Sequence, residues 1–206
     1  MKNKFKALVA NTGEDSLSYL DLEKGEIIRT IDLKKQNYSN IGPYELVSKG
    51  DLIYCTNIYD NSLYKIDIDK GQILDSLYIG SYPSCIKIFE EYFYIINTDS
   101  NSISIIDNEK FSLIGNIPVR DRPMDMEIDE LNEKLYIANS NSRSISRIDL
   151  RNSEILNIIL ENNPLKIILD EDQIFVLSII SDSPMPKSSI SLVDSENLKE
   201  KKLIDI

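Results

Sequence analysis

Histidine and tryptophan are both absent from this chain of 206 residues. Without histidine there is no imidazole base, no Ser/His or Cys/His nucleophile pair and no histidine-ligated metal site. The two cysteines, Cys55 and Cys85, both fall inside apolar runs, and we expect them to be buried, reduced thiols. The sequence therefore predicts no catalytic centre, no metal site and no cofactor, in a reducing compartment.

Long apolar runs and basic clusters are also lacking. No stretch approaches the roughly 18 apolar residues that a membrane-spanning helix needs. The apolar run 7–10 near the N-terminus is too short for the core of a signal peptide. The net charge is -11, and a surface this acidic repels the phosphate backbone of nucleic acids. We therefore expect a cytoplasmic protein without membrane or nucleic-acid partners.

A repeated pattern runs through nearly the whole chain. A short run of the form Ser-apolar-x-x-apolar-Asp recurs, and its aspartates are spaced 46, 40, 42 and 45 residues apart. The aspartates are Asp21, Asp67, Asp107, Asp149 and Asp194. A period in the forties, built of strand-like runs, is typical of a β-propeller in which each repeat forms one blade. We interpret each aspartate as the start of a tight turn, because Asp side chains bond their own backbone in turns.

Two further markers keep the same period. Prolines open apolar runs, and asparagines end apolar-aromatic runs. The prolines are Pro43, Pro83, Pro123 and Pro164, and the asparagines are Asn11, Asn57, Asn97 and Asn139. With the run that follows each aspartate, a complete repeat offers four strand candidates, which we call A, B, C and D in chain order.

These runs resemble the YVTN β-propeller repeat, in which a Pro-led strand precedes a Tyr-Val-Thr-Asn-like strand and then a Val-Ile-Asp-ended strand. The resemblance covers nearly the whole chain, and its best copy is 134–160. It implies a propeller fold and lactonase-like or lyase-like relatives. Because such propellers serve many unrelated roles, the resemblance implies no single activity.

We predict an all-β protein, a β-propeller of about five four-stranded blades in a single domain. The predicted repeats are approximately 1–42, 43–82, 83–122, 123–163 and 164–206. The first repeat begins at strand B, so its blade should lack the inner strand A. Two explanations stay open: a fragment of a six- or seven-bladed ring, or a short ring with an unpaired edge that invites association.

Binding residues of such folds are expected where the B–C and D–A loops share one face, or in the central channel. The candidate binding residues are Lys87, Arg120, Asp121, Arg122, Asp125, Glu127, Arg143, Lys166 and Met185. Arg120, Asp121 and Arg122 form the densest charged loop of the chain. Met185 lies between two prolines in an insertion of the fifth repeat, and extra loop length on a binding face often carries function.

Alternation along the A strands predicts which side chains face the channel. These are Glu45, Val47, Cys85, Lys87, Asp125, Glu127, Lys166 and Ile168. In a narrow channel, Asp125 and Glu127 could perturb each other's pKa. The simpler interpretation is that they form ion pairs with Lys87 and Lys166 or are simply solvated.

The predicted function is a non-enzymatic binding scaffold that presents its loop face to a protein partner. One alternative is a lactonase-like or lyase-like enzyme that acts on a small molecule through Asp125, Glu127 or Arg122. The other is a homo-oligomer, a self-associating propeller in which a partner chain supplies the missing strand.

Overall fold

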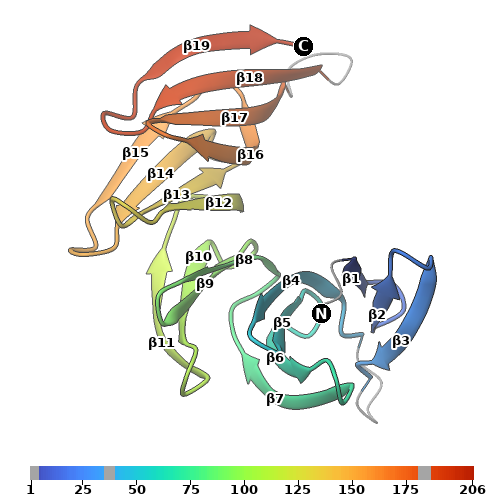
Figure 1. Ribbon diagram of the computed structural model, residues 1–206. Coiled ribbons are helices and arrows are strands. Elements are labelled where there is room, and N and C mark those ends of the chain that lie inside the picture. Colours follow the sequence, from blue (N-terminus) through green and yellow to red (C-terminus); the bar gives the residue numbers. More distant parts are fainter. Residues whose placement is uncertain (1–4, 35–39, 181–186) are drawn as a thin grey trace.

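The computed structural model describes residues 5–34, 40–180 and 187–206. Over these ranges the chain folds into nineteen β-strands, with no helix among them, and so with no helix suited to crossing a membrane. The strands form five separate antiparallel sheets, which we call blades 1 to 5 in chain order (Figure 1).

Consecutive strands are neighbours within every blade. Blade 1 contains β1 (Lys6–Asn11), β2 (Ser16–Asp21) and β3 (Glu26–Asp32). Blade 2 contains β4 (Pro43–Lys49), β5 (Leu52–Asn57), β6 (Ser62–Asp67) and β7 (Gln72–Tyr78). Blade 3 contains β8 (Pro83–Phe89), β9 (Tyr92–Asn97), β10 (Ser102–Asp107) and β11 (Ser112–Pro118). Blade 4 contains β12 (Pro123–Asp129), β13 (Lys134–Asn139), β14 (Ser144–Asp149) and β15 (Ile155–Ile159). Blade 5 contains β16 (Asn163–Asp170), β17 (Gln173–Ile180), β18 (Lys187–Asp194) and β19 (Glu200–Asp205).

The blades are arranged side by side around their inner strands. β4, β8, β12 and β16 follow one another, each packed against the next. Figure 1 shows the result as an open arc, with blade 1 in blue at one end and blade 5 in red at the other. This radial stacking of small antiparallel sheets is a β-propeller, as the repeat predicts. Among the described residues the expected absence of an inner strand from the first blade is also confirmed, because blade 1 has three strands there and the other blades have four.

The turn chemistry inferred from the repeated aspartates is confirmed as well. The Asp21 carboxylate accepts hydrogen bonds from the backbone N–H groups of Glu23 and Lys24, both at 3.1 Å. The aspartates at 67, 107, 149 and 194 accept equivalent bonds from the residues that follow them. Each C strand therefore ends where its own sequence supplies a turn.

The hydrophobic core lies between the blades. In β13, Leu135 and Ile137 pack toward blade 3, whereas Tyr136 and Ala138 pack toward blade 5. We call the face that a blade turns toward the next blade its forward face, and the opposite one its rear face. Because the arc is open, the forward face of blade 5 and the rear face of blade 1 have no described blade packed against them.

Candidate functional site

The inner strands are joined by polar side chains at one repeated position, two residues after each proline. In blade 2, Glu45 accepts a hydrogen bond at 2.9 Å from the backbone N–H of Ile86 in blade 3. In blade 4, Asp125 accepts one at 3.0 Å from the backbone N–H of Ile167 in blade 5. These carboxylates connect neighbouring blades, because each takes up a backbone donor from the next inner strand.

Both candidate lysines of the inner strands form ion pairs with the candidate acids. Lys87 lies 2.9 Å from Glu127, and Lys166 lies 3.1 Å from Asp125. Burial disfavours the charged form of Lys87, but Glu127 outweighs this effect, and the pKa of Lys87 is raised. The ion-pair interpretation of these residues is confirmed.

Three other residues expected in the channel lie elsewhere. Cys85 is 2% exposed, in the core between blades 3 and 4. Val47 packs into the core between blades 2 and 3, and Ile168 lies on the forward face of blade 5. The reason is that alternate side chains of an inner strand point to the two faces of its own blade.

The loop-face end of the inner strands encloses a cavity of about 380 Å³, which we call the mouth cavity. It is lined by Tyr44, Glu45, Ser84, Met124, Leu165 and Lys166. Burial raises the pKa of Glu45, while the Ile86 N–H and nearby lysines oppose that shift. The mixture of apolar walls with one acid and one base suits a small molecule or a single side chain of a partner.

The loop candidates do not line the mouth cavity. Arg120, Asp121, Arg122 and Arg143 are all exposed. Arg122 has a φ of 56°, and its backbone N–H donates to the Asn101 side chain at 2.8 Å. The Met185 prediction falls outside the described residues.

Sequence reasoning missed the tyrosines of the loop face. The rings of Tyr44 and Tyr82 lie 6.4 Å apart, and Tyr59 covers Gly42, where a Cβ would meet its ring at 2.5 Å. Their signal was present, since Tyr44 directly follows one marker proline and Tyr82 directly precedes another.

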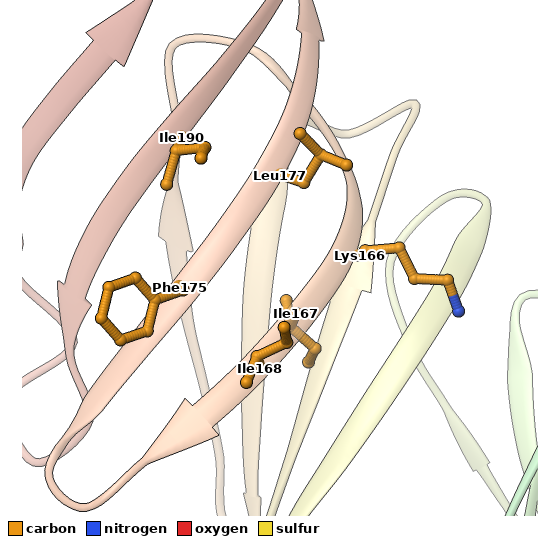
Figure 2. Close-up of a pocket in the computed structure, with 6 residues that line it drawn as sticks. All are labelled: Lys166, Ile167, Ile168, Phe175, Leu177 and Ile190. Carbon is orange, nitrogen blue, oxygen red and sulfur yellow. The ribbon is translucent and has the colours of Figure 1, made fainter.

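An apolar surface on the forward face of blade 5 was missed too. Figure 2 shows Ile168, Phe175, Leu177 and Ile190 on β16, β17 and β18, with the Lys166 chain directed away from them. Strand register pairs Phe175 with Ile168 and Leu177 with Ile190, which places all of them on one face. They line a hollow of about 530 Å³.

We predict an almost constant thermal midpoint between about pH 6 and 8, because the chain has no histidine to titrate there. Below about pH 4 the midpoint should fall. Hydrogen bonds from Lys6 and from turn N–H groups lower the pKa of Asp21. Hydrogen bonds from a nearby Lys or Arg side chain and from turn N–H groups likewise lower the pKa values of the other turn aspartates. A lowered pKa stabilises the fold above the ordinary aspartate pKa, and this stabilisation is lost as the pH falls through the folded value.

Glu45 acts with the opposite sign. Its raised pKa stabilises the fold at low pH, and that contribution is lost as the pH rises through the folded value. Calorimetric scans from acidic to neutral pH measure both effects. A midpoint that moves by several degrees between pH 6 and 8 would contradict the prediction.

No family model and no curated protein match this chain. Solved structures similar to it include the mitotic checkpoint complex, with a TM-score of 0.80, 11% identity, and coverage of 98% of this chain and 61% of that one. Virginiamycin B lyase from Staphylococcus aureus gives a TM-score of 0.75 and 15% identity, with coverage of 98% and 66%. Hydrazine synthase of Kuenenia stuttgartiensis gives a TM-score of 0.74 and 17% identity, with coverage of 84% of this chain and 51% of that one. The chain thus spans between half and two thirds of the length of these structures, and at such identities the similarity shows the fold alone, a β-propeller.

Proposed function

We propose that this chain is a non-enzymatic scaffold that binds a protein partner. The observation that carries the proposal is the apolar forward face of blade 5, which no other described blade covers. Contiguous exposed apolar patches on soluble proteins mark interaction sites. On blades 1 to 4 the equivalent faces are buried against the next blade.

Blades 4 and 5 give a direct comparison of that face. Tyr136 and Ala138 of blade 4 are 1% and 0% exposed, because blade 5 covers them. The corresponding Phe175 and Leu177 of blade 5 are 39% and 40% exposed. The surface that covers blade 4 is the apolar rear face of blade 5. We therefore expect the partner to present an apolar sheet surface of the same kind.

The loop face supplies a second set of contacts for the same role. Tyr44 and Tyr82 lie close together beside the mouth cavity, and tyrosine is enriched among the residues that dominate protein interfaces. A YVTN-like repeat is part of this proposal. It is supported by A strands that begin with proline in blades 2 to 4, B strands that end with asparagine in blades 1 to 4, and C strands that end with aspartate in blades 1 to 5. The buried free thiols Cys55 and Cys85 support a cytoplasmic setting.

The test is the double variant Phe175→Lys with Leu177→Lys. Because both side chains are already partly exposed, the fold should survive, while binding of a hydrophobic dye and capture of a reproducible partner should fall by about tenfold or more. Ile114→Lys is the matched control, since Ile114 is an exposed apolar residue on the outer strand β11. Unchanged dye binding and an unchanged set of captured proteins would contradict the proposal.

The second candidate function is an enzyme acting on a small molecule in the mouth cavity. The observation that favours it is Glu45, whose raised pKa beside the Lys166 ammonium group provides a carboxyl group and a cation in one cavity. Turnover of sugar lactones that is abolished by Glu45→Gln or Asp125→Asn would favour this candidate over the scaffold.

A further inference from the structure

The open edge of β1 lies at the other end of the arc from the blade 5 face. Over the described residues, β1 hydrogen-bonds with β2 alone, and no described strand holds the place that β4, β8, β12 and β16 hold in their blades. β1 nevertheless packs beside β4, just as β5 packs beside β8 and β13 beside β16. Blade 1 is therefore positioned as if an inner strand were present.

The backbone of β1 presents an unpaired ladder to this edge. The Leu22 N–H donates to the Phe5 carbonyl at 2.8 Å, so alternation along the antiparallel pair directs the N–H and C=O groups of Lys6, Leu8 and Ala10 away from β2. In blade 4 the Leu150 N–H donates to the Glu133 carbonyl at 2.9 Å in the same way.

The corresponding backbone N–H and C=O groups of blade 4 are hydrogen-bonded to another strand. The residues equivalent to Lys6, Leu8 and Ala10 are Lys134, Tyr136 and Ala138, and all of them pair with the inner strand β12. The open edge of β1 therefore matches a surface that already accepts a strand elsewhere in this molecule.

The inner strands of blades 2 to 4 define what such a strand must carry. In blades 2 and 4 its third residue accepts a hydrogen bond from the backbone N–H of the next inner strand: Glu45 from Ile86, and Asp125 from Ile167. For a strand added to blade 1, the corresponding donor is the N–H of Leu46 on β4. A carboxylate is the strongest acceptor for it.

The position after the acceptor must be apolar. Ile86, Met126 and Ile167 hold this position in blades 3 to 5, and each is at most 2% exposed. A proline begins the inner strand in blades 2 to 4, and Pro164 is the second residue of the inner strand β16 in blade 5.

We propose that β1 accepts, as the inner strand of blade 1, an extended segment with the pattern Pro-x-acid-apolar. The segment runs antiparallel to β1, with its acidic third residue opposite Ala10. A second copy of this chain is a poor donor, because its own inner strands are already paired within their blades. This site is separate from the blade 5 face and does not depend on it.

The probe is a fluorescent peptide with the sequence of residues 123–129, one of the chain's own inner strands. We expect saturable binding to the full chain by fluorescence anisotropy. Changing Asp125→Lys within the peptide should weaken binding by about tenfold or more, because the charge-assisted bond to β4 is lost. N-methylation of the peptide at the Glu127 position, whose N–H faces β1 in this register, should weaken it similarly.

N-methylation at the Ile128 position is the matched control, since that N–H points away from β1, and it should leave affinity within about twofold. In the protein, Ala10→Pro removes a donor at the open edge and should abolish binding, whereas Ala10→Ser should not. The Phe175→Lys, Leu177→Lys variant should bind the peptide normally, which separates this inference from the proposed function. Absence of saturable binding, equal affinity of the two N-methylated peptides, or a stable dimer by light scattering that excludes the peptide would overturn it.

Discussion

Replacing Phe93 by alanine is expected to lower the free energy of unfolding by about 4 kcal/mol, the largest stability loss that we predict for this chain. Phe93 is fully buried on β9. It lies in the cluster between blades 2 and 3, where its ring centroid is 4.3 Å from that of Tyr54. Truncation removes this ring pair and leaves a cavity that neighbouring strands, fixed by their ladders, cannot fill.

Urea denaturation followed by circular dichroism measures this loss. Ile114→Ala on β11 is the control, and a change within about 0.5 kcal/mol is expected there because Ile114 is exposed. Phe93→Leu should fall between the two variants. A loss below about 1 kcal/mol for Phe93→Ala would show that blades 2 and 3 do not depend on this cluster.

The fold could be predicted because its determinants are local and repeated. A proline, an asparagine or an aspartate at each strand end acts on the backbone within a few residues, so its effect is visible in the sequence. Asp107 begins its turn although residues 108–111 contain no glycine. Phe111, with a φ of 50°, adopts there the left-handed conformation that Gly25 and Gly71 adopt in blades 1 and 2. The burial of that phenylalanine near Tyr54 depends on blade 2, and nothing local indicates it.

The site was predicted less well, because it depends on which blade lies next to which face. The pairing of Lys166 with Asp125 could be anticipated, since both belong to inner strands at equivalent positions. The exposure of Phe175 and Leu177 could not be predicted from strand periodicity alone. In β17, as in every B strand, both faces are apolar, and only the open end of the arc leaves one of them uncovered.

Removing the Asp125 carboxylate is the second change with a large expected effect. Asp125 is 5% exposed and accepts hydrogen bonds from the Ile167 N–H and from Lys166. Asp125→Ala leaves a buried backbone donor between blades 4 and 5 without its acceptor, which should cost about 3 kcal/mol. Most of that cost comes from the Ile167 N–H, which is left without a hydrogen-bond acceptor. The Lys166 side chain is 66% exposed, so its ammonium group can be hydrated instead.

A series of three variants separates these contributions. Asp125→Asn keeps an oxygen for the Ile167 N–H and loses only the charge, so about 1 kcal/mol is expected. Glu127→Gln breaks an ion pair with Lys87. The Glu127 side chain is 31% exposed, against 7% for the Asp125 side chain, and over the described residues the Glu127 carboxylate accepts its hydrogen bond from Lys87 and not from a backbone donor, so the change should cost less than about 1 kcal/mol. If Asp125→Ala and Glu127→Gln destabilise the protein equally in urea, the inner strands are held by charge alone. The backbone acceptor role given to Glu45 and Asp125 would then fail, and with it the acidic position required of a strand that binds β1.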